Sequence, residues 1–184
     1  GIVIANLCIY SAFVTIPIGE TMALFFIAPL MITSMSSLIF KQKVQLINWI
    51  AVLVGLVGVL LIVKPGFEDF TLGYLLPLIA AFSYTIVQLI TYKIGKTEKA
   101  SSLGFYIQLV LIMVSLIVGL ILGDGKYGNP SDATIDFLFR SWKIPKLFDG
   151  LIIIGSGLLS GMGMFFISHA YRSSKGSTVA SFEY

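Results

Sequence analysis

The sequence has few charged residues, one cysteine and one histidine. Only 11% of its 184 residues are charged, against about 25% in a typical soluble domain. With Cys8 as the single cysteine no intrachain disulfide can form, and with His169 as the single histidine no zinc-type ligand spacing is present. The sequence also has no HExxH motif, no paired carboxylates within an apolar run and no nucleophile beside a base. We therefore expect no enzyme active site, no metal site and no cofactor.

Long apolar runs fill the space between the sparse charges. Hydrophobic residues make up 57% of the chain and the mean hydropathy is +0.97. A helix needs about 20 apolar residues to cross the hydrocarbon core of a bilayer. The apolar runs predict helices over residues 2–13, 18–40, 44–63, 72–92, 102–122 and 151–171, and a further helix that begins near residue 176. The expected fold class is an all-α integral membrane protein, a polytopic helical bundle with the lipid bilayer as its partner.

The charges between these helices predict the topology. The loops after the second, fourth and sixth predicted helices hold seven basic residues and one acid, and the other connections hold five basic residues and seven acids. Basic loops of membrane proteins face the cytoplasm. The net charge of +3 is explained by these cytoplasmic lysines, and we expect no nucleic-acid partner. The predicted location is the cytoplasmic (inner or plasma) membrane, with multiple passes.

The connection at about 126–149 lies outside the membrane in this topology and has an amphipathic pattern. Its apolar residues Ile135, Leu138, Phe139 and Trp142 follow helical spacing, and Ser131 or Asp132 could cap the helix. A helix this short cannot span, so we expect it to lie in the membrane interface, with docking of a partner as the alternative.

A short motif occurs twice. Residues 19–25 (GETMALF) and 176–182 (GSTVASF) both read G-x-T-x-A-x-F, at the starts of the second and seventh predicted helices. Five helix steps separate the copies, so the two copies run in opposite directions across the membrane. Inverted repeats of this kind are typical of transporters that work by alternating access.

The chain resembles the EamA type of the drug/metabolite transporter superfamily. The segments that carry the resemblance to the first EamA repeat are 16–21 (IPIGET), 26–30 (FIAPL), Trp49 and 55–66 (GLVGVLLIVKPG). Those that carry the resemblance to the second repeat are 142–145 (WKIP), 169–172 (HAYR) and 180–184 (ASFEY). The resemblance covers nearly the whole chain and implies a ten-helix fold of two inverted five-helix repeats.

On that scheme the chain is a fragment of a transporter-sized protein. Residues 1–66 correspond to the C-terminal part of the first repeat, with the end of its third helix and its fourth and fifth helices. Residues 67–184 correspond to the N-terminal part of the second repeat, with helices six to eight, the external amphipathic loop and the start of helix nine. The short apolar segments at both ends agree with this interpretation.

Polar side chains within the apolar runs are the candidates for a substrate cavity. Polar groups are costly in lipid unless they find a partner or water. The candidates recur at helical spacing on several predicted helices and are Asn6, Tyr10, Tyr84, Gln88, Tyr92 and Gln108. Hydrogen bonding between helices is the alternative role for each of them.

Two further residues and two glycine pairs stand out. Glu183 is the one acid inside an apolar segment, where it is either a proton-coupling or cation-binding site or a hydrogen-bonded carboxylate at a water-filled vestibule. Pro29 lies within the predicted helix 18–40, where a kink could act as a hinge or only set the shape. The pairs Gly119/Gly123 and Gly157/Gly161 have the GxxxG spacing that lets helices approach closely.

The sequence is therefore interpreted as a secondary transporter that moves a small metabolite by alternating access. The resemblance adds amino acids, nucleotide-like metabolites and drugs as substrate classes. The alternatives are a non-transporting membrane scaffold or sensor and, with less support, a membrane enzyme that acts on lipid. The substrate, the direction of transport, the coupling ion and a homodimeric state stay open at this point.

The predicted topology can be tested with reporter fusions. A reporter that is active only outside the cytoplasm should be inactive when it is fused after Lys96, because that loop is basic and faces the cytoplasm. A fusion within residues 126–149 is the matched control and should be active. The reverse pattern of activity would show that the topology is inverted.

Overall fold

The computed structural model describes residues 1–41, 43–63, 72–95, 97, 99–128 and 133–183, and over these residues its secondary structure consists of helices without strands. Its helices are α1 (Ile2–Thr15), α2 (Ile18–Phe25), α3 (Ala28–Phe40), α4 (Leu46–Val63), the short 3₁₀ helix η1 (Leu72–Tyr74), α5 (Leu75–Ile94), α6 (Ala100–Leu122), α7 (Ala133–Phe139), α8 (Leu147–Ser173) and α9 (Gly176–Ala180). Residues 64–66, which we expect to end the third predicted helix, lie outside the described part, as do the predicted caps Ser131 and Asp132.

Four segments of the described chain are long and apolar enough to cross a membrane. They are Ile18–Phe40, which joins α2 and α3, Leu75–Ile94, Ser102–Leu122 and Leu147–Ser173. The helices Ile2–Thr15 and Leu46–Leu61 are apolar but shorter. The protein is therefore a multi-pass membrane protein.

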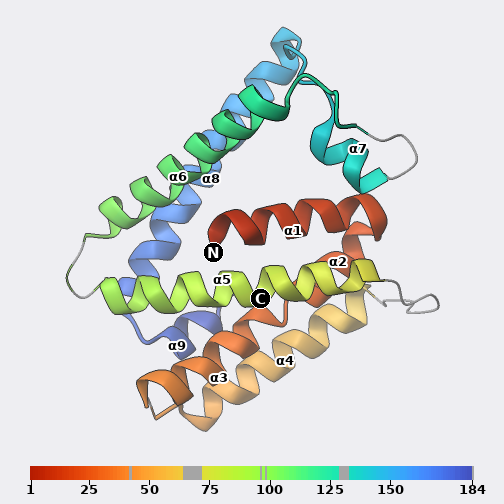
Figure 1. Ribbon diagram of the computed structural model, residues 1–184. Helices are drawn as coiled ribbons and strands as arrows, with labels where there is room; N and C mark the ends of the chain where they lie inside the picture. Colours follow the sequence, from red (N-terminus) through yellow and green to blue (C-terminus); the bar gives the residue numbers. More distant parts are fainter. Residues whose placement is uncertain (42, 64–71, 96, 98, 129–132, 184) are drawn as a thin grey trace.

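The helices form two packed groups (Figure 1). In one group α1 lies along α5, and α5 also contacts α2 and α3. In the other group α6 lies along α8, and the pair is inclined to α1 and α5. The helix α7 lies against α1, and α9 packs on α3.

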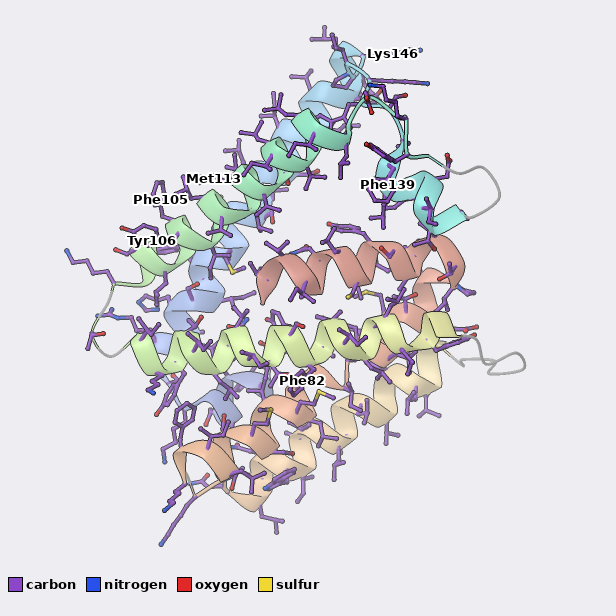
Figure 2. The ribbon with its side chains drawn as sticks, in the orientation of Figure 1. Phe82, Phe105, Tyr106, Met113, Phe139 and Lys146 are labelled. Atoms are coloured by element: carbon purple, nitrogen blue, oxygen red, sulfur yellow. The ribbon has the colours of Figure 1, made fainter. Side chains whose placement is uncertain are left out.

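The buried positions are occupied mostly by small or polar residues. Alanines of α1 and α5 are buried where these helices meet, and Thr21, Thr33, Ser36 and Thr85 are completely buried. Large apolar side chains point outward instead, and Figure 2 shows Phe105 and Met113 on the side of α6 that faces away from α1. This distribution is expected in lipid, where small residues let helices approach and large apolar side chains meet the acyl chains.

The predicted helix 18–40 is broken rather than kinked. α2 ends at Phe25 and α3 begins at Ala28. Between them lies a turn, in which the backbone N–H of Ile27 donates a hydrogen bond to the carbonyl oxygen of Leu24 with 3.2 Å between nitrogen and oxygen. Pro29 therefore lies in the first turn of α3 and not in the middle of a helix. The reason is physical: proline has no N–H to donate, and the N–H groups in the first turn of a helix have no acceptor within that helix.

The amphipathic helix is shorter than the spacing predicts, because α7 ends at Phe139 and leaves Trp142 in an extended segment. The backbone N–H of Trp142 donates to the carbonyl of Gly123 at 3.0 Å, so it is not available for a helical bond to Leu138.

In the exposed turn after α6, a hydrogen bond and ion pair with Lys126 lower the pKa of Asp124.

α8 begins at Leu147, four residues before the predicted start at residue 151. Lys146 is extended and follows Pro145, and its carbonyl accepts a hydrogen bond from the N–H of Gly150 at 2.8 Å. Asp149 stands in the first turn, where its negative charge interacts favourably with the helix dipole. The polar residue at 149 thus belongs to the start of the helix and not to the loop.

The contact between α9 and α3 can be tested at Gly176. A Cβ atom at this position would lie 2.9 Å from the Ser36 hydroxyl oxygen, so Gly176→Val should overpack the contact. Overpacking a tight site costs about 1–3 kcal/mol. We expect a lower thermal unfolding midpoint in detergent for this variant than for the wild-type protein.

Gly155→Val is the matched control, because nothing lies within 4 Å of the corresponding Cβ on α8. If both variants unfold at the same temperature, the close packing of α9 on α3 is refuted.

Candidate functional site

Three neighbouring cavities lie between the helices. The α1–α6 cavity has a volume of about 360 Å³ and is lined by residues of α1, α6 and the extended segment that follows α7. The central cavity has a volume of about 230 Å³ and lies among α1, α2, α5, α6 and α8. The Glu183 cavity has a volume of about 310 Å³ and is lined by α2, α3, α5, α8 and Glu183.

The cavities adjoin one another through shared side chains. Asn6 and Leu111 line both the α1–α6 cavity and the central cavity. Phe25 and Tyr84 line both the central cavity and the Glu183 cavity. The three cavities therefore form a row that crosses the bundle from Trp142 at one end to Glu183 at the other.

The walls of the α1–α6 cavity and the central cavity combine aromatic rings with amide and hydroxyl groups. Tyr10 and Trp142 line the α1–α6 cavity. Gln108 and Ser160 face the central cavity. The Nδ2 group of Asn6 donates to the carbonyl of Ile2 at 3.0 Å, which fixes its amide on the wall that the two cavities share. Such walls suit a mostly apolar ligand that has a few hydrogen-bonding groups.

Glu183 is held by two tyrosine hydroxyls. The Tyr171 hydroxyl of α8 donates to Oε1 of Glu183 at 2.7 Å, and the Tyr84 hydroxyl of α5 donates to the same oxygen at 3.2 Å. Tyr171 is completely buried, and the ring of Tyr84 packs on Phe25 with 5.6 Å between the centroids. Hydrogen bonds to a carboxylate are stronger than those between neutral groups. The two tyrosines therefore offset part of the cost of placing a carboxylate in an apolar segment.

The structure brings most of the predicted site residues together. Asn6, Tyr10, Tyr84, Gln108 and Glu183 line the row of cavities, as does Pro29 at the start of α3. The other two candidates, Gln88 and Tyr92, line none of the three cavities.

Gln88 and Tyr92 lie on α5 away from the row of cavities. Gln88 is 2% exposed and is buried in the packed bundle, one helical turn from Tyr84. The ring of Tyr92 packs on Phe40 with 5.2 Å between the centroids. Both side chains contribute to helix packing in this structure.

Sequence reasoning missed three residues that line the cavities or hold Glu183. Tyr171 lies near the end of its apolar run, where a tyrosine suggests an interfacial anchor, and Phe25 resembles any other lipid-facing phenylalanine. Trp142 was assigned to the apolar face of an amphipathic helix that ends before it. The spacing of residues along a helix gives no sign of these roles, because each depends on contacts between distant segments.

The described residues contain no group of three or more His, Cys, Asp or Glu side chains that could hold a metal ion. The hydrogen-bonding groups of the cavities come instead from amides, hydroxyls and one carboxylate. Such groups can form hydrogen bonds with a small molecule, and the residues that line the three cavities include no nucleophile beside a base.

The chain is similar to curated bacterial transporters. It is 28% identical over 169 residues to a riboflavin transporter of Vibrio cholerae and covers 51% of that protein. It is 23% identical over 168 residues to an S-adenosylmethionine uptake transporter of Rickettsia prowazekii, again covering 51%. A riboflavin transporter of Rhizobium johnstonii is 23% identical over 168 residues, of which the chain covers 50%.

These alignments include 91–92% of the present chain, which spans about half the length of the curated relatives it matches. No family model matches the chain, and no solved structure matches it. The relatives are named as transporters and not as enzymes, which agrees with the expectation that this chain is not an enzyme. Together with the four candidate spans, they support a membrane transporter.

The different environments of Gln108 and Gln88 can be tested by thiol labelling. In a Cys8→Ala background, Gln108→Cys should react with a polar thiol reagent, because residue 108 lines the central cavity. Gln88→Cys is the matched control and should be protected, because residue 88 is buried. Labelling rates are measured in membranes, and faster labelling at residue 88 than at residue 108 would contradict the assignment of the cavity wall.

Proposed function

We propose that this chain forms part of a secondary transporter that moves a small metabolite across the cytoplasmic membrane by alternating access. The observation that carries the proposal is the row of three adjoining cavities, whose walls hold Asn6, Tyr10, Tyr84 and Gln108 and whose end holds Glu183. Similarity to riboflavin and S-adenosylmethionine transporters supports the same function. Both names indicate a nucleotide-like metabolite as the first class to test.

An inverted-repeat architecture of the EamA type is part of this proposal. Residues 1–66 and 67–184 belong on this scheme to two five-helix repeats, and the G-x-T-x-A-x-F motif opens a short helix in each, α2 and α9. Ala23 and Ala180, which occupy the same position of the motif, are both buried. Equivalent burial of equivalent residues is expected where two repeats pack around a common centre.

Glu183 is the proposed coupling residue. Its carboxylate lines a cavity and is held by Tyr84 and Tyr171, which come from two different helices. A change in its charge would alter both hydrogen bonds at once and thereby the contact between α5, α8 and the segment after α9. Pro29 lines the same cavity beside the break between α2 and α3, and we assign this break as the hinge.

Transport can be tested with the full-length protein in liposomes. Counterflow with labelled riboflavin, S-adenosylmethionine, nucleosides and amino acids should give a saturable overshoot for one compound. The Glu183→Gln variant should retain counterflow but lose uptake driven by an ion or proton gradient, because the amide cannot carry the coupling charge.

Glu20→Gln is the matched control. Glu20 accepts a hydrogen bond from the Tyr74 hydroxyl at 2.6 Å and lines none of the three cavities, so this variant should keep gradient-driven uptake. Folded protein that shows no overshoot with any compound would favour a membrane scaffold or sensor. Unchanged gradient-driven uptake in Glu183→Gln would refute the coupling role alone.

A further inference from the structure

Trp142 lies in a connection between two helices and yet lines one of the three cavities. This residue lies in the extended segment between α7 and α8, where its backbone N–H is tied to the carbonyl of Gly123 at 3.0 Å. Its side chain nevertheless lines the α1–α6 cavity together with Tyr10 and Ser115. A residue from a connecting segment thus forms one wall of a cavity within the helical bundle.

Two glycines of α6 provide the seat for the indole. A Cβ atom at Gly119 would overlap the six-membered ring of Trp142, and a Cβ atom at Gly123 would lie 3.3 Å from its Cγ. The pair Gly119/Gly123, which has the spacing expected for helix packing, therefore accommodates a side chain. One side of the indole rests on α6, and the residue as a whole is still 61% exposed.

Trp142 borders two hollows. One is the α1–α6 cavity, and the other is a groove of about 550 Å³ that Trp142 lines with Phe137, Arg140 and Lys143. Trp142 is the residue that these two hollows share. In the predicted topology the groove lies on the external side, so Trp142 stands where a solute would pass between the external solution and the row of cavities.

The surrounding groups indicate which solutes this place can take. Tyr10 presents a second aromatic ring, held by an edge contact with Phe13 at 6.0 Å between centroids. The Nδ2 group of Asn6 is bonded to Ile2, which leaves its Oδ1 atom to accept a hydrogen bond from a ligand, and Ser115 adds a hydroxyl. Aromatic faces bind flat rings by stacking, and an acceptor at the wall suits a ring whose edge carries N–H groups.

We propose that Trp142 is a stacking platform at the external end of the row of cavities and that its ligand is a planar nitrogen heterocycle. The hydrogen bond to Gly123 positions the backbone of Trp142, and the indole lies against Gly119 and Gly123 of α6. This inference rests on the proposed transport function, whose substrate class it narrows. It assigns a specificity-determining role to a residue outside the membrane-spanning helices.

Tryptophan fluorescence tests the platform directly, because Trp49 and Trp142 are the two tryptophans of the sequence. In full-length protein with its other tryptophans replaced by Phe, one variant keeps only Trp142 and a matched variant keeps only Trp49, which lines none of the three cavities. Riboflavin, adenosine and uridine are added as probes, and ribitol serves as the aliphatic control. We expect a saturable loss of Trp142 emission with at least one heterocycle, no change with ribitol and no saturable loss for Trp49.

The outcomes separate this inference from the proposed function. If no heterocycle gives a saturable change at Trp142, or if both variants respond equally, the platform is overturned. Counterflow is measured on the same vesicles: transport without a Trp142 response overturns the platform and keeps the transporter. A Trp142 response that is specific to heterocycles, without counterflow, would support the stacking role of Trp142 and contradict the transport function. Trp142→Leu should weaken heterocycle binding more than Trp142→Phe, because leucine keeps apolar volume but loses the aromatic face.

Discussion

The structure depends on one constraint: a polar group in hydrocarbon must find a partner within the protein. Some hydroxyl side chains meet this requirement on their own helices, as where Thr85 donates to the carbonyl of Ala81 at 2.8 Å and Ser34 to that of Leu30 at 2.8 Å. The buried hydroxyls of Thr33 and Ser36 are exceptions and have no hydrogen-bond partner among the described residues. Glu183 cannot be satisfied locally and draws Tyr84 and Tyr171 from two other helices. The carboxylate therefore connects α5 and α8 with the segment that follows α9.

The same constraint separates two sets of polar residues: small hydroxyl residues such as Thr21 and Thr85 are buried between the helices, whereas Asn6, Tyr84 and Gln108 line the cavities. Large apolar side chains lose nothing by facing lipid, so they lie outside, and the interior is left to small residues that do not fill it completely. Space remains where three or more helices meet, and the break between α2 and α3 adds to it because Phe25 and Phe26 line the Glu183 cavity beside Pro29. The packing of the helices and the row of cavities between them thus follow from the same distribution of small and large side chains.

Much of this arrangement could be predicted from the sequence, because apolar runs and clustered charges report directly on lipid as solvent. The helices follow from this signal, and Asn6, Tyr84 and Gln108, which the same signal marks as cavity candidates, line the central cavity, although their role in binding stays a prediction. The break between α2 and α3 does not follow, because the sequence predicts a kink within one helix over residues 18–40. Gln88 shows its limit: spacing places it on the same face as Tyr84, but only the packing of neighbouring helices decides that it is buried. Tyr171 and Trp142 escaped prediction because their roles arise from segments far apart in the chain.

The glycines of α6 show why a motif alone does not define a contact. GxxxG spacing removes side chains from one strip of a helix, and the strip can then receive either another helix or a single large side chain. At Gly119 and Gly123 the strip receives the Trp142 indole, whereas Gly157 on α8 has nothing within 4 Å of its Cβ position. The partner is chosen by the hydrogen bond from the Trp142 backbone to Gly123, which brings the extended segment back onto α6. The wall of the α1–α6 cavity is therefore fixed by a backbone contact outside the helices, and its aromatic character follows from the residue that this contact places there.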